Sequence, residues 1–162
     1  MKKLLIIATA LGLSTAAMAA DLPKKNAPAA PSYTDAASPF FLGINAGGIN
    51  NSNDYTLGLN AGANVTDFII GEVAYDHLHD EDANQVTGNV IVEAPVGSLK
   101  PYVLGGVGYR WAEQDEAVWN VGLGTKVAVT DNIDFDLRYR HVVGFESEHK
   151  DDIITGGLVL KF

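Results

Sequence analysis

The chain has 162 residues, 20 of them acidic and 11 basic, and its formal net charge is −9 at pH 7. This length is enough for one domain. The acidic balance argues against nucleic acid as a partner, because phosphate binding requires clustered basic residues. The sequence contains no cysteine, which excludes disulfides, thiolate chemistry and cysteine-ligated metals.

Residues 1–20 have the layout of a secretory signal peptide. Lys2 and Lys3 precede an apolar run over 4–13, and small residues in an Ala-x-Ala pattern follow it. The apolar run is too short to cross a bilayer as a helix. We therefore expect export and removal of residues 1–20. Residues 21–39 are rich in proline and alanine without periodicity, which predicts a mobile segment ahead of the fold.

Residues 40–162 alternate between apolar and other residues with a period of two, which indicates β-strands. Each segment has about ten residues or slightly more, the length that a tilted strand needs to cross a bilayer. We predict an all-β fold, namely an eight-stranded antiparallel up-and-down transmembrane β-barrel. The expected strands are 40–48, 54–65, 67–78, 84–95, 99–112, 116–129, 132–145 and 151–162.

The connections between these segments are of two kinds. Tight turns with turn-forming residues are expected at 65–67, 95–98 and 130–132. The other connections are longer or more charged and fall at 49–54, 78–84, 112–117 and 144–152. Short turns at one end and polar loops at the other are typical of membrane barrels. An even strand count places both ends of the barrel segment on the short-turn side.

One face of every expected strand is apolar, and the other is small or polar. A soluble lipocalin-like barrel would bury the apolar face, whereas a membrane barrel would present it to lipid. Glycines such as Gly58, Gly106 and Gly122 lie in mid-strand on the polar face. Glycine on a water-facing strand weakens it, while a narrow lumen needs small residues beside long ones. The pattern therefore favours the membrane arrangement.

Aromatic residues gather near both ends of the expected strands, as in the two interfacial belts of membrane proteins. One belt is expected near the short turns, from Phe40, Phe68, Tyr102, Phe135 and Phe162. The other is expected near the longer loops, from Tyr55, Tyr75, Tyr109, Trp111 and Trp119.

Several motifs, taken in order, resemble the small eight-stranded outer-membrane barrels of the OmpA-like and opacity-protein-like superfamily. They are the AADLP start after the leader, PFFLGINAGG, the VTDF and VTDN turns, KPYVLGGVGYRW, DLRYRH and the closing LVLKF. The resemblance implies a bacterial outer-membrane location, periplasmic termini, and contact with membrane lipid and lipopolysaccharide. It also implies that barrel-assembly machinery reads the last strand as an insertion signal, here Leu158, Leu160 and Phe162.

Charged residues of both signs fall on the polar, lumen-facing set. An eight-stranded barrel is only wide enough for side chains, and unpaired charges there would be costly. We therefore expect an ion-pair network that plugs the bore, with a small conductance as the alternative. Its members are Glu72, Glu93, Arg110, Lys126, Asp134, Asp136, Arg138, Arg140 and Lys161.

The longer loops are acidic, and clustered carboxylates could hold divalent cations or bridge to lipopolysaccharide phosphates. They contain no calcium-loop motif, which favours a solvated acidic rim. The carboxylates are Asp80, Glu81, Asp82, Glu113, Asp115, Glu116, Glu146, Glu148, Asp151 and Asp152.

No catalytic, cofactor or metal site is expected. His141 lies where lipid A deacylases carry their catalytic histidine, but those enzymes have serine two residues later and this chain has Val143. His77 and His79 are expected on opposite strand faces, a poor arrangement for a shared metal. We predict a structural barrel that supports envelope integrity, without enzymatic activity. The alternatives are a surface adhesin or receptor acting through the acidic loops, and a narrow low-conductance pore.

Overall fold

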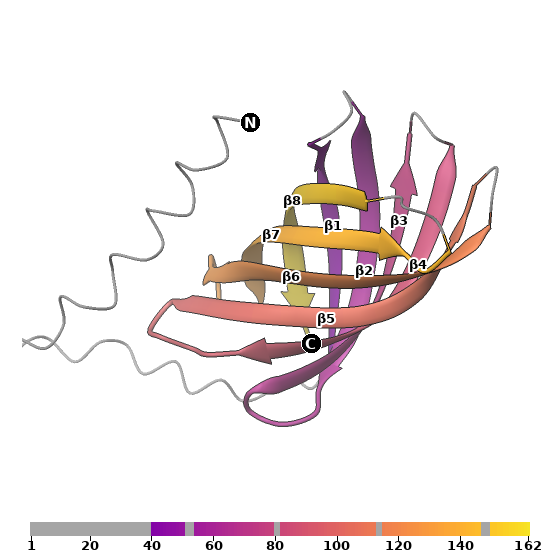
Figure 1. Ribbon diagram of the computed structural model, residues 1–162. Coiled ribbons are helices and arrows are strands. Elements are labelled where there is room, and N and C mark those ends of the chain that lie inside the picture. Colours follow the sequence, from indigo (N-terminus) through magenta and orange to yellow (C-terminus); the bar gives the residue numbers. More distant parts are fainter. Residues whose placement is uncertain (1–39, 51–53, 80–81, 113–114, 147–149) are drawn as a thin grey trace, which may run out of the picture. The chain divides into compact units, whose positions relative to one another are not determined.

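A computed structural model describes residues 40–50, 54–79, 82–112, 115–146 and 150–162. The predicted leader, residues 1–20, and the segment 21–39 lie outside the described residues. Eight strands form one closed barrel, in which each strand pairs antiparallel with the next (Figure 1). They are β1 (Phe40–Ile49), β2 (Tyr55–Asn64), β3 (Ile69–Leu78), β4 (Ala83–Glu93), β5 (Leu99–Trp111), β6 (Glu116–Ala128), β7 (Ile133–Gly144) and β8 (Lys150–Lys161).

The predicted fold class is confirmed, and the observed strand ends differ from the predicted ones by no more than two residues. Closure comes from β8 pairing with β1, in a register running from Phe41 opposite Lys161 to Ile49 opposite Ile153. The backbone N–H of Phe162 donates to the carbonyl of Phe40 at 3.1 Å. A closed sheet leaves no edge strand with unpaired backbone groups, which a bilayer would not tolerate. In the described ranges, no helix has the length and apolar character needed to cross a membrane.

Three tight turns lie at one end of the barrel, which we call the turn end; the opposite end is the loop end. Two of these turns are built alike. Thr66 Oγ1 accepts a hydrogen bond from the N–H of Ile69 at 3.0 Å, and Thr130 Oγ1 accepts one from Ile133 at 3.0 Å. The turn after β4 uses Gly97 at a φ of 64°, a conformation that favours glycine. Turn chemistry therefore fixes the hairpin registers.

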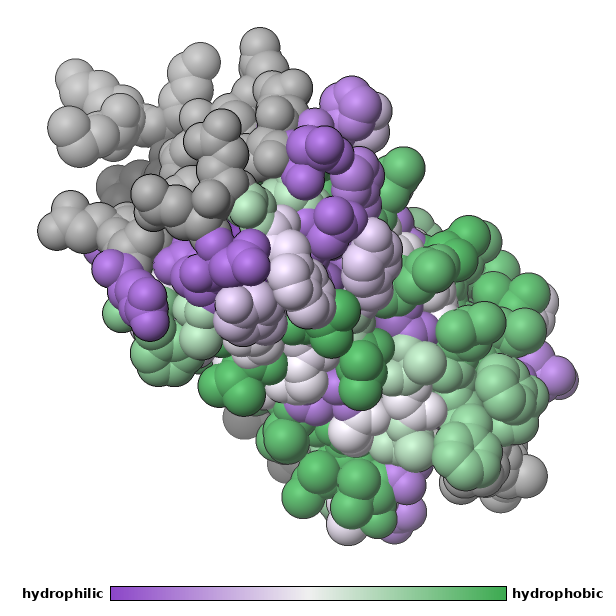
Figure 2. All heavy atoms as spheres, turned by 90° about the vertical axis from the view of Figure 1, so that its right-hand side faces the viewer, coloured by the Kyte–Doolittle hydropathy of each residue, from purple (hydrophilic) through white to green (hydrophobic). Residues whose placement is uncertain are grey.

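The apolar face of each strand points outward. Ile44, Val107 and Leu123 expose about half of their surface or more, although all three lie in mid-strand. Figure 2 shows hydrophobic residues over much of the face turned to the viewer, with hydrophilic residues gathered toward one end. A soluble barrel would bury these side chains, so the lipocalin-like alternative is excluded. Such an extended apolar exterior is expected only where hydrocarbon replaces water.

Glycines of the inner face provide the space for large lumen side chains. A Cβ on Gly62 would overlap the ring of Phe41, and one on Gly124 would overlap the ring of Tyr102. On the outer face the situation differs, since a Cβ on Gly71 would meet nothing nearer than Val65 Cγ2 at 3.8 Å. The inner glycines are therefore required by packing in the bore, as their position on the polar face suggested.

The lumen also contains apolar side chains that the sequence pattern did not predict. One cluster comprises Phe41, Ile70, Ile91, Tyr102, Leu104 and Val159, and the other Ile49, Leu78, Ala83, Val118, Val142 and Ile153. The placement of Tyr102 in the turn-end belt is wrong, because its side chain is inside the barrel and only 4% exposed. Val103, its neighbour, faces outward instead. The prediction placed Tyr102 in the belt because it is near a strand end, although the period-two alternation assigns it to the inner face.

Replacing Gly124 with alanine should lower the free energy of unfolding by about 1–3 kcal/mol, because the added methyl overpacks the lumen. Its Cβ would lie 2.6 Å from the carbonyl oxygen of Leu137 as well as against Tyr102. Urea unfolding in detergent micelles measures the change. The matched control is Gly71→Ala on the open outer face, which should change stability by less than about 0.5 kcal/mol. Equal destabilisation of the two variants would contradict this packing account.

Candidate functional site

The centre of the lumen is held by Arg138 of β7. Its Nη1 and Nη2 donate to the two carboxylate oxygens of Glu72 on β3, at 2.6 and 2.9 Å. The same guanidinium donates from Nη2 to Asp136 at 2.9 Å and from Nε to the Tyr102 hydroxyl at 2.9 Å. The Tyr102 hydroxyl in turn donates to Asp136 at 2.6 Å. Three nitrogens of the fixed guanidinium fork are thus engaged across the bore.

Three asparagines extend this network around the barrel wall. Asn60 and Asn89 donate to the Glu72 carboxylate at 2.8 and 3.1 Å. Asn120 donates to Asn89 at 3.1 Å. Glu72 is only 4% exposed, so its charge is supported by protein donors in place of water. We call Glu72, Asp136, Arg138, Tyr102 and the three asparagines the central network; it joins strands β2 to β7.

Two further arginine pairs lie toward the loop end. Arg140 donates from both terminal nitrogens to the two oxygens of Asp76, each at 2.8 Å. Arg110 donates to Asp151 at 2.6 Å and to Gln85 at 3.2 and 3.3 Å. Both arginines are almost fully buried. Pairs of this kind cross the bore between β3 and β7 and between β5 and β8, so they link distant parts of the wall.

Lysines neutralise acids at the turn end. Lys126 Nζ lies 2.8 Å from Glu93 and sits over the rings of Phe41 and Tyr102, at 5.4 and 5.5 Å from their centroids. Lys161 Nζ lies 3.0 Å from Asp134 Oδ1 as an ion pair, without the alignment of a hydrogen bond. The Lys126 ammonium group therefore combines charge pairing with cation–π contact at this end of the bore.

All nine residues expected in the lumen network point inward. They do not form ion pairs only among themselves, however. Arg110 and Arg140 take acids that the sequence analysis had not assigned to the lumen, namely Asp151 and Asp76. The placement of Asp151 in the solvated acidic rim is wrong, because it is 6% exposed and paired with Arg110. Asp76 was missed although it is four residues from Glu72 on the same face of β3. Strict period-two counting would have found both residues.

Glu116 also departs from the expected acidic rim. It is the first residue of β6, faces inward and is 9% exposed. Asp80, Glu81, Glu113 and Glu148 of that rim lie outside the described residues. Within the described part of the chain, no group of three or more histidines or acids has the geometry to hold a metal ion.

Apart from Tyr102, the residues expected in the aromatic belts lie on the exterior. Phe40, Phe135 and Phe162 are exposed at the turn end, and Tyr55, Tyr75, Tyr109 and Trp111 at the loop end. Trp119 is half-buried on the same outward face. The rings of Tyr109 and Trp111 pack edge to face, with centroids 5.3 Å apart. Leu158, Leu160 and Phe162, the expected assembly signal, share the outward face at the end of β8, each about half exposed or more.

The histidines at the loop end also differ from expectation. The assignment of His77 and His79 to opposite faces is wrong, because residues two apart in a strand share a face. Their ring centroids are 6.4 Å apart, and His79 stacks on Tyr55. His141 is hydrogen-bonded through Nδ1 to Asp152 at 2.8 Å, so Asp152 is on the barrel wall and not in a free loop.

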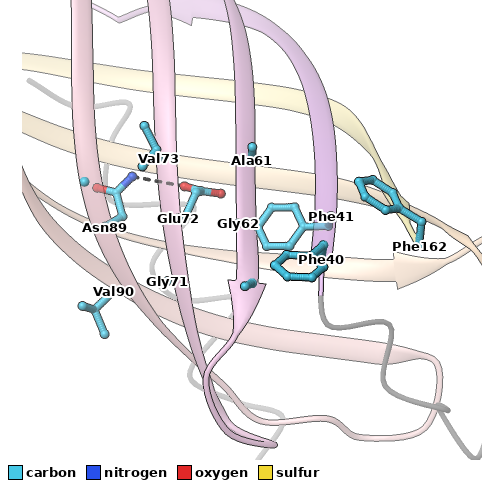
Figure 3. Close-up of a pocket in the computed structure, with 12 residues that line it drawn as sticks. Phe40, Phe41, Ala61, Gly62, Gly71, Glu72, Val73, Asn89, Val90 and Phe162 are labelled. Carbon is cyan, nitrogen blue, oxygen red and sulfur yellow. Dashed lines mark hydrogen bonds between the residues drawn. The ribbon is translucent and has the colours of Figure 1, made fainter.

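A hollow of about 660 Å³ opens at the turn end between β1 and β4 (Figure 3). Glycines, alanines, valines and three phenylalanine rings make up most of its lining. Its two polar residues, Glu72 and Asn89, are hydrogen-bonded to each other and belong to the central network. The hollow therefore offers apolar surface and no polar group free to orient a substrate.

Comparison with known proteins gives one family and a consistent set of structures. A family model described as outer membrane protein beta-barrel domain matches residues 5–162. The N-terminal β-barrel domain of Pseudomonas aeruginosa OprF is 18% identical, with a TM-score of 0.67 over 78% of this chain and 98% of that chain. Neisserial surface protein A is 16% identical, with a TM-score of 0.65 over 76% of this chain and 97% of that chain.

An enzyme has the same fold. The outer membrane enzyme PagL is 13% identical, with a TM-score of 0.54 over 75% of this chain and 99% of that chain. At these identities the likeness shows the fold alone. No curated protein sequence matches this chain.

Replacing Arg138 with methionine should lower the free energy of unfolding by about 3–5 kcal/mol, because it leaves Glu72 and Asp136 charged and buried without their partner. Urea unfolding followed by tryptophan fluorescence measures it. Lys161→Met is the control: Asp134 keeps Lys100 Nζ at 3.6 Å from its Oδ2, so loss of Lys161 should cost less, about 1 kcal/mol. A similar cost for both variants would mean that the central network does not carry the stability.

Proposed function

The chain belongs to the family of outer membrane protein β-barrel domains, and from that premise we propose that it is a structural barrel whose lumen is closed by its own charged side chains. In this role it adds a rigid, non-conducting element to the bacterial outer membrane and supports envelope integrity. The single observation that carries the proposal is the Arg138–Glu72 pair, which bridges opposite walls at the centre of the bore.

The packing around that pair supports closure over pore function. Hydrated ions need a continuous polar path, whereas this bore contains two apolar clusters in addition to the central network. The low exposure of Arg138, 5%, and of Tyr102, 4%, supports a bore without an open aqueous path. A narrow bore is also what eight strands impose.

We place the turn end and the described termini, Phe40 and Phe162, in the periplasm, and the loop end outside. The longer, acidic connections then face the medium, where divalent cations could bridge them to lipopolysaccharide phosphates. Acids such as Asp115 and Glu146 remain exposed in the described residues and would take part. Asp151 and Glu116 would not, because they face the lumen.

The proposed role includes no catalysis, although PagL shows that the fold can carry an enzyme. His141 is oriented by Asp152, but Val143 stands where a serine nucleophile would be needed. A histidine–carboxylate pair without a nucleophile does not make an acyl-transfer site.

The closed lumen predicts that the refolded protein conducts no sustained current in a planar bilayer. The double variant Glu72→Ala/Arg138→Ala should also conduct no sustained current, because the Arg140–Asp76 pair and the two apolar clusters still fill the bore. Both proteins must first show the altered electrophoretic migration of an unboiled, folded barrel. Stable open-channel current from the unaltered protein would refute closure and favour the narrow-pore alternative.

An adhesin role would instead require the exposed loops. Replacing residues 145–149 with a Gly/Ser stretch tests this role. The replacement stops before Asp151, because that residue pairs with Arg110 in the lumen. Cell or matrix binding that disappears in this variant would favour the adhesin over the structural role.

We further propose that Leu158, Leu160 and Phe162 form the signal read by the barrel-assembly machinery. Phe162→Ala should lower the amount of barrel in the outer membrane of cells, while leaving urea stability of the refolded protein within about 0.5 kcal/mol. Phe40→Ala is the matched control, since Phe40 is similarly exposed at the same end and hydrogen-bonds Phe162 through backbone only. Equal amounts of the two variants in the outer membrane would contradict the proposal that Phe162 is part of the assembly signal.

A further inference from the structure

A Tyr-x-His segment occurs twice on the outer face, on strands that lie four apart in the barrel. The first is Tyr75 to His77 on β3, and the second is Tyr139 to His141 on β7. The middle residues, Asp76 and Arg140, form the ion pair across the lumen. The two tyrosine–histidine pairs, one from each segment, therefore lie on opposite outer walls of the barrel, near the loop end.

Each outward pair converges on one side chain of the following strand. On one wall, Tyr75 OH and His77 Nδ1 lie 2.6 and 3.0 Å from Asn84 Oδ1. On the other, Tyr139 OH and His141 Nδ1 lie 2.7 and 2.8 Å from Asp152 Oδ1. The two clusters have the same geometry and differ in charge, because one is closed by an amide and the other by a carboxylate.

The arrangement at Asn84 indicates that this hydrogen-bond geometry does not by itself require a carboxylate. Asn84 holds the same two groups with a neutral oxygen, and Asp152 takes no part in the lumen pairs. An ionisable group on a lipid-facing surface is costly and calls for a partner. Its surroundings on that surface, Ile154 on the same strand and Val121 beyond His141, are apolar and about half exposed. The carboxylate is thus better explained by something it meets from outside.

Asp152 retains a free acceptor for such a partner. Both protein donors use Oδ1, and within the described residues Oδ2 has no hydrogen-bond partner. The side chain of Asp152 is 24% exposed and that of His141 35% exposed. Lys150 is exposed and two residues earlier on the same strand face, so its Cα lies about 6.6 Å from that of Asp152 and its long side chain carries an ammonium group on the same surface. The surface therefore presents a negative and a positive charge side by side at the loop-end aromatic belt.

We propose that Asp152 and Lys150 bind the zwitterionic headgroup of a membrane lipid. A primary ammonium of the headgroup donates to Asp152 Oδ2, and its phosphate pairs with Lys150. Tyr139 and His141 act as positioning residues that hold the carboxylate. The inference rests on the barrel lying in a bilayer and is independent of whether the lumen conducts. The matching chemistry is that of a phosphoethanolamine group, whether on a phospholipid or on a glycolipid.

Native mass spectrometry of the full, refolded barrel in micelles doped with one lipid at a time tests the proposal. The probes are phosphatidylethanolamine, phosphatidylcholine, which lacks the N–H donors, and phosphatidylglycerol, which lacks the cation. The protein should retain phosphatidylethanolamine about tenfold more than either, the value of one charge-assisted hydrogen bond. Absence of that preference would overturn the proposal. If a glycolipid that carries phosphoethanolamine competes with phosphatidylethanolamine for this site, the glycolipid is a second source of the bound headgroup.

Asp152→Asn turns this cluster into a copy of the one at Asn84 and should abolish the preference without loss of folding. Asn84→Leu is the matched control on the opposite wall and should leave retention unchanged. Folding of each variant is checked by its migration before and after boiling. Retained preference in Asp152→Asn, or an equal loss in Asn84→Leu, would show that the carboxylate does not bind the headgroup. Either result leaves the conductance test of the lumen unaffected.

Discussion

The bidentate pair between Arg138 and Glu72 is the contact on which the rest of the lumen depends. It joins β7 to β3 across the bore, and Tyr102, Asp136 and three asparagines hydrogen-bond to one or the other partner or to each other. In a low-dielectric interior a fully hydrogen-bonded network is rigid, whereas loss of one partner leaves a buried charge. In the proposed role this electrostatic cross-brace closes the bore, with apolar clusters toward its ends.

This cross-brace is possible because the side chains along each strand point alternately to the outside and to the inside of the barrel. The outward face must be apolar to meet hydrocarbon, so every polar group that fills the bore comes from the other set of residues. Large side chains such as Phe41 and Tyr102 fit because glycines stand opposite them, at Gly62 and Gly124. The same constraint makes the outer glycines different. Gly71 faces open space, and nothing in the barrel itself requires it.

The fold could be predicted from the sequence because period-two alternation, two kinds of connection and mid-strand glycines all indicate the same barrel. The lumen could be predicted only in part. Alternation along each strand predicts which residues face the lumen. The errors arose where this alternation was not applied: Tyr102 was assigned to the exterior because it is near a strand end, and Asp151 was assigned to a loop because it belongs to an acidic run. Pairing could not be predicted, since Arg140 meets Asp76 from strands four apart in the barrel and only the closed geometry brings them together. The partnership of His141 with Asp152 likewise depends on the β7–β8 register.

Side-chain hydrogen exchange of Arg138 tests the closed lumen most directly. In the refolded, isotope-labelled barrel, the guanidinium N–H signals of Arg138 should be resolved from each other and exchange with water far more slowly than those of an exposed arginine. Through-space contacts to the carboxylate-bearing side chain of Glu72 should accompany them. Our account predicts slow exchange because each nitrogen donates to a buried acceptor. Rapid exchange with averaged signals would mean that water reaches the guanidinium and that the bore is open.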